Sequence, residues 1–212
     1  MKFSDRASLP TRFGTFEVQA VQDEAGGKEH LVILHGDVKG KPDVPVRIHS
    51  ECLTGDVMGS LRCDCRDQVE RALLLIQEDG AGILIYLRQE GRGIGLMNKI
   101  RAYSLQERGY DTVEANQRLG FEDDLRSYDL AVKILKALDV KSVALITNNP
   151  EKIEALVRGG IPIARRIPLV IAPNRFNEEY LKTKESKLGH LFSEESDDES
   201  LPLSSSNERR KC

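Results

Sequence analysis

The chain has 212 residues, 40% of them hydrophobic and 31% charged, a composition typical of a soluble globular protein of one domain or two small lobes. No apolar run approaches the roughly 20 residues that a membrane-spanning helix needs, and residues 1–5 lack the apolar segment of a signal peptide. Tryptophan is absent and aromatic residues make up only 5%, so surfaces that stack nucleic-acid bases are not expected.

The net charge of −3 is concentrated at the C-terminal end. Residues 193–212 hold six of the 34 acidic and three of the 31 basic residues, which leaves 28 of each sign in the rest of the chain. Residues 1–192 therefore carry no net charge, which excludes a general affinity for polyanions. We expect residues 193–212 to form a disordered, polar tail, with Cys212 as an exposed thiol. The four cysteines lack the spacing of a disulfide framework such as secreted proteins have, so we expect the protein to work in the reducing cytoplasm.

The N-terminal part is rich in β-branched residues, and the rest alternates between strand and helix patterns. Strands are predicted over residues 15–21, 30–38, 44–49, 82–87 and 142–146, with an extended run over 161–170. Helices are predicted over residues 67–79, 93–108, 124–138, 152–158 and 177–192. This order indicates a mixed α/β fold with a β-rich N-terminal part followed by strand–helix alternation.

Three of the four cysteines, Cys52, Cys63 and Cys65, lie close together in the sequence. Three thiolates can hold Zn²⁺ and leave the fourth tetrahedral position open for water, as catalytic zinc sites do. A structural zinc site completed by His49 and a pair of redox-active thiols are the alternatives that the spacing leaves open. A disulfide between Cys63 and Cys65 is disfavoured, because it would close a very tight and strained ring.

Residues 88–96, with the sequence RQEGRGIGL, follow a predicted buried strand and begin a helix. Ligands of α/β sheets bind where strands end. Glycines let backbone N–H groups approach a phosphate, and Arg88 and Arg92 add forked donors for its oxygens. The glycine spacing matches neither the dinucleotide motif nor the P-loop, so a structural turn between strand and helix is the alternative.

Two further segments suit a phosphorylated ligand. Thr147 can contact a base or ribose and Lys152 can neutralise a phosphate, although the Asn-Asn-Pro run between them is also a signal for the start of a helix. Asp124 and Arg126 flank the predicted start of a helix. An acidic residue there stabilises the helix dipole; the functional interpretation places both residues at a phosphate beside the metal.

Together these motifs resemble the GTP cyclohydrolase II family, whose members open the purine ring of GTP at the start of riboflavin synthesis. The similarity rests on RxHSECLTGD at 47–56, SLRCDC at 60–65, RQEGRxIGL at 88–96, YDTVEAN at 110–116 and LxTNNP at 145–150. It covers roughly residues 9–192 and implies a GTP cyclohydrolase II catalytic domain over 1–192. The implied products are 2,5-diamino-6-(5-phosphoribosylamino)pyrimidin-4(3H)-one, formate and pyrophosphate. A homodimer is implied, with neither a nucleic-acid nor a membrane partner.

The resemblance also implies the ligands of the site. Cys52, Cys63 and Cys65 would bind one Zn²⁺ per subunit, whose bound water attacks C8 of guanine, and a second hydrolysis would release formate. Mg²⁺ would accompany the triphosphate of GTP. The residues implied to contact GTP are Arg47, Ile48, His49, Ser50, Glu51, Gln68, Glu90, Gly91, Arg92, Thr112, Thr147 and Lys152.

Tyr103, Asp124 and Arg126 are the residues implied to act in catalysis. In the family's proposed mechanism Arg126 attacks the α-phosphorus and releases pyrophosphate, Asp124 accepts its proton, and Tyr103 serves ring opening and deformylation. A guanidinium is a poor nucleophile because it stays protonated. The alternative is that Arg126 only stabilises charge on the phosphoryl group.

Two other functions compete with the full reaction. One is a GTP-binding regulatory protein whose zinc is structural. The other is an enzyme that stops at the formamide stage and releases pyrophosphate without formate.

Overall fold

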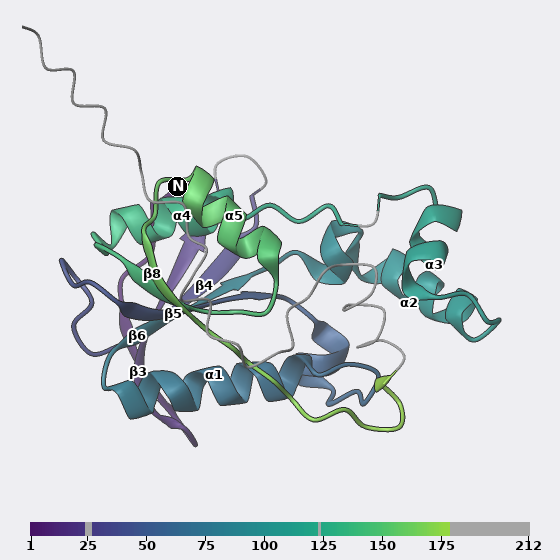
Figure 1. The fold of residues 1–212 in the computed structure, drawn as a ribbon, viewed down its shortest axis with the longest axis horizontal. Helices are drawn as coiled ribbons and strands as arrows, with labels where there is room; N and C mark the ends of the chain where they lie inside the picture. The colour runs from purple at the N-terminus through teal and green to yellow at the C-terminus, as the bar shows by residue number, and fades with distance from the viewer. Residues whose placement is uncertain (24–26, 123, 179–212) are drawn as a thin grey trace, which may run out of the picture.

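The computed structural model describes residues 1–23, 27–122 and 124–178 (Figure 1). The expected tail over 193–212, Cys212 and nearly all of the helix expected over 177–192 lie outside these residues. None of the helices in the described ranges combines the length and apolar character that crossing a membrane requires.

Within the described residues, one mixed sheet of eight strands runs through the molecule, in the order β1-β3-β4-β6-β5-β7-β8 with β2 paired to β3. The strands are β1 Lys2–Phe3, β2 Ala7–Thr11, β3 Gly14–Gln22, β4 Glu29–His35, β5 Val44–Ser50, β6 Gly82–Leu87, β7 Val143–Ile146 and β8 Ile163–Ile167. Pairings from β1 through β4 to β6 are antiparallel, whereas β6, β5, β7 and β8 run parallel. This confirms the mixed α/β fold with a β-rich N-terminal part.

Helices cover both faces of the sheet: α1 lies on one face and α4 and α5 on the other, while α2 and α3 lie beyond one end (Figure 1). The helices are α1 Cys65–Asp79, α2 Gly95–Gln106, α3 Thr112–Arg118, α4 Asp129–Ala137 and α5 Pro150–Arg158. A short π-helix, η1 Leu53–Val57, follows β5, and a 3₁₀ turn, η2 Glu90–Gly93, follows β6.

The central strand β6 shows how the two hydrophobic clusters are divided. Ile83 and Ile85 pack in the cluster that contains Leu135 of α4, whereas Leu84 packs in the cluster that contains Ile76 of α1. Successive side chains of a strand point to opposite faces, so β6 is buried on both sides, as parallel strands in α/β proteins are. Each fully buried Leu or Ile stabilises the fold by about 1.5–3 kcal/mol.

Most of the predicted elements are confirmed, but the helix predicted over residues 124–138 starts too early. It begins at Asp129, and the residues before it form an irregular segment. There the carboxylate of Asp124 accepts hydrogen bonds from the backbone N–H and the guanidinium of Arg126. Such local side-chain bonds compete with helix formation, so the dipole explanation of Asp124 is wrong.

Two predicted strands are shorter than expected. The run predicted over 30–38 ends as β4 at His35, because Gly36 takes a left-handed conformation with φ of 61°. The extended run over 161–170 contains only β8, which lies between Pro162 and Pro168. Strands β1 and β2, η1 and the helix α3 were not predicted.

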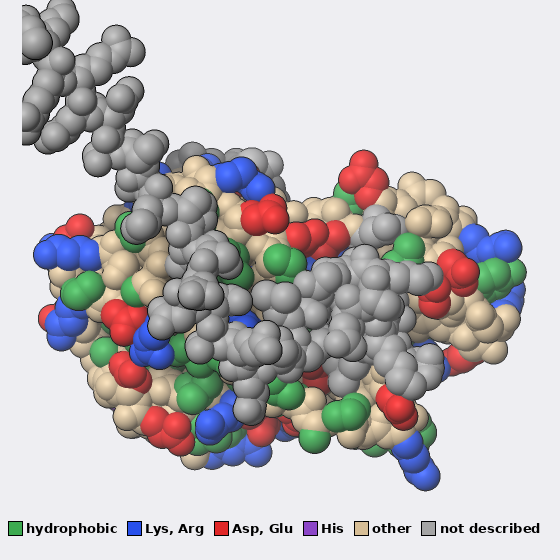
Figure 2. Space-filling view, viewed as in Figure 1, with side chains coloured by type: hydrophobic (Ala, Val, Ile, Leu, Met, Phe, Trp, Pro, Cys, Tyr) green, Lys and Arg blue, Asp and Glu red, His purple; other side chains and the backbone are tan. Residues whose placement is uncertain are grey.

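The topology brings the carboxyl ends of β6, β5 and β7 to one edge of the sheet, because these neighbours are parallel and in register. Ser50 of β5 pairs with Leu87 of β6, so the segments that follow them leave the sheet together. Elsewhere the surface is mixed: Figure 2 shows acidic and basic side chains interspersed over the described part of the visible face.

We expect Leu135→Ala to lower the free energy of unfolding by about 2–5 kcal/mol, because Leu135 is fully buried and its truncation leaves a cavity between α4 and the sheet. Urea denaturation measures this change. The control is Lys133→Ala, an exposed position on the same helix, which should change stability by less than about 0.5 kcal/mol. Equal effects of the two substitutions would contradict the packing described for α4.

Candidate active site

A cavity of about 710 Å³ opens at the carboxyl ends of β5, β6 and β7, a size typical of small-molecule sites. Most of the residues predicted from the sequence line it: Arg47, His49, Ser50, Glu51, Cys52, Cys63, Cys65, Gln68, Glu90, Gly91, Arg92, Tyr103, Thr112, Arg126, Thr147 and Lys152. Segments separated by up to a hundred residues therefore meet at one place, as the ends of parallel strands predict.

The three cysteines form a compact group around the π-helix η1. Cys52 precedes η1, Cys63 lies in the turn after it, and Cys65 is the first residue of α1. Their sulfur atoms all lie within 4.8 Å of one another, with Cys52 and Cys63 at 3.6 Å. A tetrahedral zinc ion with Zn–S bonds of about 2.3 Å separates its sulfur ligands by roughly 3.8 Å, so the geometry fits.

Gly55 makes the close approach of these sulfurs feasible. A Cβ at this position would lie 2.7 Å from Sγ of Cys63 and 3.1 Å from Sγ of Cys52. Asp56 closes the turn, because its carboxylate accepts the backbone N–H of Cys52 at 2.9 Å. The three thiols can hold a metal ion such as zinc, and in the described residues no further Cys, His, Asp or Glu joins the group.

His49 is not part of this group, which argues against the structural Cys₃His site. Its Nε2 lies 3.1 Å from both carboxylate oxygens of Asp56, and its ring stacks on Tyr86. Burial lowers the pKa of His49 more than the Asp56 hydrogen bond raises it, so the ring is neutral and Nε2–H donates to Asp56. Among the described residues Nδ1 has no partner and offers the cavity a buried acceptor.

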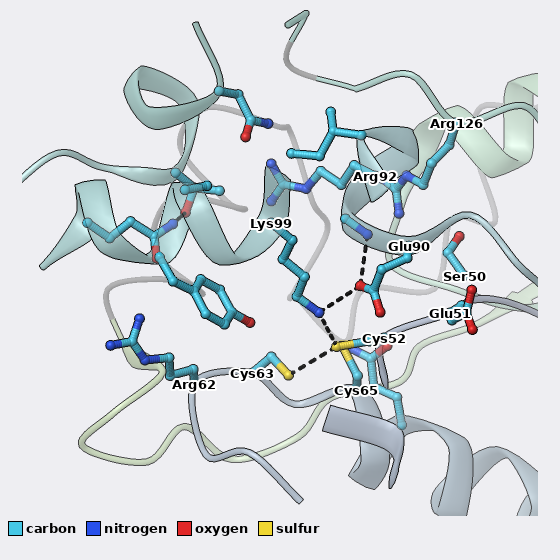
Figure 3. Close-up of a pocket in the computed structure, with 18 of the residues that line it drawn as sticks. Ser50, Glu51, Cys52, Arg62, Cys63, Cys65, Glu90, Arg92, Lys99 and Arg126 are labelled. Carbon is cyan, nitrogen blue, oxygen red and sulfur yellow. Dashed lines mark hydrogen bonds and ion pairs between the residues drawn. The ribbon is translucent and has the colours of Figure 1, made fainter. Parts of the chain in front are cut away.

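Lys99 of α2 is a site residue that the sequence did not reveal. Its ammonium lies 3.1 Å from Sγ of Cys52 and 2.7 Å from a carboxylate oxygen of Glu90 (Figure 3). Burial lowers the pKa of Lys99, but its bonds to Glu90 and Cys52 raise it by more, and Lys99 is charged. Lys99 precedes Tyr103 by four residues, which places both on one face of a helix. This spacing is the feature of the sequence from which Lys99 could have been predicted.

Tyr103 presents its hydroxyl to the sulfur side of the cavity. The hydroxyl lies 3.3 Å from Oγ1 of Thr54 in η1, and the guanidinium of Arg62 lies over its ring at 4.8 Å. Burial raises the pKa of Tyr103, so the phenol stays protonated and can donate a hydrogen bond. Arg62 belongs to the SLRCDC motif but was not predicted as a site residue.

Besides Lys99 and Arg62, further basic side chains line the cavity. Arg47 donates to the carbonyl of Ile146 at 3.0 Å, and burial lowers its pKa to about 10. Lys152 of α5 donates to the carbonyl of Ile48 at 2.8 Å. Arg92 and Arg126 reach the cavity above the sulfur atoms in the view of Figure 3. These cations give the cavity a region that favours anions.

The loop that carries Arg92 is held against the segment that carries Arg126. Arg92 itself has a left-handed φ of 57°, a conformation that is rare outside glycine and common at functional sites. The backbone N–H of Leu125 donates to the carbonyl of Arg92 at 3.0 Å. A Cβ at Gly93 would lie 2.9 Å from the Cβ of Leu125, so only glycine permits this contact.

The sequence model of the GTP cyclohydrolase II family matches residues 2–168. The chain belongs to the GTP cyclohydrolase II family.

Relatives match nearly end to end. The GTP cyclohydrolase-2 of Picrophilus torridus is 57% identical over 192 residues, which cover 91% of this chain and 100% of that protein. The GTP cyclohydrolase-2 of Shewanella halifaxensis is 50% identical over 196 residues, covering 92% of this chain and 93% of that protein.

Among solved structures, RibBX, a two-domain 3,4-dihydroxy-2-butanone 4-phosphate synthase from A. baumannii, aligns with a TM-score of 0.45 and 16% identity. The alignment covers 81% of this chain and 40% of that structure.

Two residues expected from the GTP cyclohydrolase II resemblance do not line the cavity. The side chain of Ile48 is fully buried in the core, and its carbonyl accepts a hydrogen bond from a cavity residue, Lys152. Asp124 instead pairs with Arg126, whose Nε lies 2.9 Å from both of its carboxylate oxygens. Burial raises the pKa of Asp124, but the hydrogen bonds and the positive charge of Arg126 lower it by a larger amount, so the pKa lies below its ordinary value. Asp124 is therefore a carboxylate that orients Arg126.

We expect Gly55→Ala to reduce zinc affinity by about tenfold or more, a loss comparable to removing a group that orients a metal ligand. The added methyl group collides with the sulfurs of Cys63 and Cys52. Zinc content by elemental analysis and competition with a chromophoric chelator measure the effect. Val57→Ala, at an exposed position of η1, is the control and should bind zinc normally. Normal zinc binding by both variants would contradict the steric account.

Proposed function

We propose that this chain is a zinc-dependent GTP cyclohydrolase II that converts GTP to 2,5-diamino-6-(5-phosphoribosylamino)pyrimidin-4(3H)-one, formate and pyrophosphate. The observation that carries the proposal is the division of one cavity into a three-sulfur metal group and a cluster of basic residues. A guanine ring placed at the sulfurs puts the triphosphate within reach of the cations.

Cys52, Cys63 and Cys65 would hold Zn²⁺. Three soft thiolate ligands suit this metal and leave one position open. When bound, the metal supplies a water of lowered pKa for hydrolysis at C8. The chain's own contribution is to fix the three sulfurs through η1 and to keep the guanine ring beside them.

The buried polar groups at the ends of β5 and β7 are suited to bind and orient the base. Nδ1 of neutral His49 accepts a hydrogen bond, and burial at 2% exposure makes leaving it unpaired costly. Thr147 and Gln68 line the same wall. A ligand with N–H groups along one edge, as guanine has, would satisfy Nδ1 of His49.

Arg92, Arg126 and Lys152 would bind the triphosphate, and Mg²⁺ would accompany it and neutralise part of its charge. The paired carboxylate of Asp124 orients the guanidinium of Arg126. A protonated guanidinium has no lone pair with which to attack phosphorus. We therefore assign Arg126 the stabilisation of charge on the phosphoryl group as pyrophosphate leaves.

Tyr103 would deliver or hold a proton during ring opening and deformylation. Its hydroxyl is protonated, positioned by Thr54 and on the sulfur side of the cavity. Proton transfer by a positioned side chain typically contributes about 10²- to 10⁴-fold to the rate.

Three further features belong to the proposal. The catalytic domain would extend over residues 1–192, the active species would be a homodimer, and the enzyme would work in the cytoplasm. Sedimentation of the purified protein tests the dimer, and removal of residues 193–212 with retained activity tests the domain boundary.

The primary test is GTP turnover by the purified protein with Mg²⁺, with pyrophosphate and formate quantified in parallel. We expect equal amounts of both, and loss of formate after treatment with a zinc chelator and in Cys52→Ser. Serine removes one thiolate without a large change in volume. Readdition of Zn²⁺ should restore the chelated enzyme but not the variant.

The other outcomes separate the competing functions. Pyrophosphate without formate from the zinc-loaded protein would identify the enzyme that stops at the formamide stage. GTP binding without either product would identify a regulatory protein with structural zinc. Normal formate release by Cys52→Ser would refute the role of the cysteines.

We expect Tyr103→Phe to lower formate release by about 100-fold or more, because only the proton-donating hydroxyl is removed. Pyrophosphate release should fall much less, since Arg126 and its neighbours are untouched. Ser104→Ala removes an exposed hydroxyl next to Tyr103 in α2 and is the control. A parallel loss of both products in Tyr103→Phe would contradict a proton-transfer role.

A further inference from the structure

Lys99 connects the metal group to the glycine-rich turn. Its side chain extends from α2 between Cys52, which follows β5, and Glu90, which follows β6 (Figure 3). Only 11% of the side chain is exposed. A lysine buried to this extent needs partners for its charge, and here one of the partners is a metal-binding sulfur.

Glu90 holds the ammonium in place. One of its carboxylate oxygens accepts from Lys99 at 2.7 Å and from the backbone N–H of Gly91 at 2.8 Å. The other accepts the backbone N–H of Leu53, the first residue of η1, at 2.6 Å. A carboxylate has about four acceptor sites, so three of them serve to fix Lys99 and the two loops around it.

The position of the ammonium on Cys52 has an electrostatic consequence. Three thiolates around a divalent cation leave the centre with a charge of −1, and electron donation by the sulfurs weakens the metal as a Lewis acid. An N–H···S bond withdraws electron density from the thiolate, and groups hydrogen-bonded to metal ligands tune the metal in this way. The 3.1 Å separation of Nζ and Sγ is short enough for such a bond.

We propose that Lys99 is a positioning residue whose ammonium, held by Glu90, hydrogen-bonds the Cys52 thiolate and keeps the bound metal strongly electrophilic. The inference deepens the proposed function and rests on the metal site described there. It gives Glu90 a role as the anchor of Lys99, in addition to any contact with GTP.

The competing explanation is that Lys99 and Glu90 form a purely structural ion pair that joins α2 to β6. Both explanations predict lower stability when Lys99 is replaced. Only the proposed role predicts a change in the electronic structure of a metal–sulfur bond, so the decisive measurement is spectroscopic.

The experiment replaces Zn²⁺ by Co²⁺ in the intact protein and records the sulfur-to-cobalt charge-transfer band in the near ultraviolet. In Lys99→Met, which keeps the length of the side chain but has no donor, the band should move to longer wavelength, because the sulfur lone pair is less stabilised. Lys99→Arg should remain close to wild type. Arg101→Met, at an exposed position of the same helix, is the control and should leave the band unchanged.

A double variant separates the proposed role of Lys99 from a general loss of stability. Lys99→Met alone leaves the buried Glu90 carboxylate unpaired, which is strongly destabilising. Lys99→Met combined with Glu90→Gln removes both charges and should show the same band shift in a more stable protein. In the zinc-loaded enzyme, kcat for formate release should fall about 10- to 100-fold in Lys99→Met, with a smaller change in KM and partial recovery in Lys99→Arg.

The outcomes separate this inference from the proposed function. If the wild-type protein binds no Co²⁺ at the cysteines, the metal site itself is refuted. If Co²⁺ binds but its band is the same in the wild type, the single variant and the double variant, the role of Lys99 is refuted while the metal site stands. A shift in both Lys99→Met proteins and none in Arg101→Met supports the inference.

Discussion

The parallel register of β6, β5 and β7 is the constraint on which the rest of the site depends. Because these strands end at the same edge of the sheet, the segments that leave them start side by side although they are far apart in sequence. The segment after β5 forms η1 and supplies the sulfurs, and the segment after β6 forms η2 and supplies Glu90 and Arg92. The segment after β7 caps α5 and positions Lys152. A change in register would separate the metal group from the cations, so fold and chemistry are coupled through backbone pairing.

Several buried charges at and beside the cavity have a defined counterpart. Asp124 pairs with Arg126, Glu90 with Lys99, and Asp56 accepts from His49, Tyr86 and the backbone of Cys52. Such pairs add little net stability but are costly to break. They hold the side chains in single orientations, which is what preorganised catalysis requires.

The sequence predicted the parts of the site that are local and missed those that depend on tertiary contact. The cysteine spacing and the glycine-rich run each identified a segment that lines the cavity, because backbone turns and metal ligands leave local patterns. Ile48 was taken as a contact with the rest of its motif, although strand alternation places it on the face opposite to Arg47 and His49. Lys99 left little signal, since its partner Cys52 lies 47 positions away. Helix α3 did have a signal, the capping box of Asp111 and Glu114.

The three thiols link the capacity to bind a metal to the fold around them. Hydrogen bonds from Cys63 and Cys65 lower the pKa of Cys52, assisted by Lys99, while the same proximity raises the pKa of Cys63 to about 11 and also raises that of Cys65. A metal binds cysteine in its thiolate form, so all three thiols must lose their protons to hold one. Metal binding must then displace the remaining protons, so its affinity rises with pH and its binding energy adds to folding stability. Because η1 and the start of α1 carry the sulfurs, a bound metal would stabilise the region where the cavity is formed, and its loss would weaken that wall of the cavity.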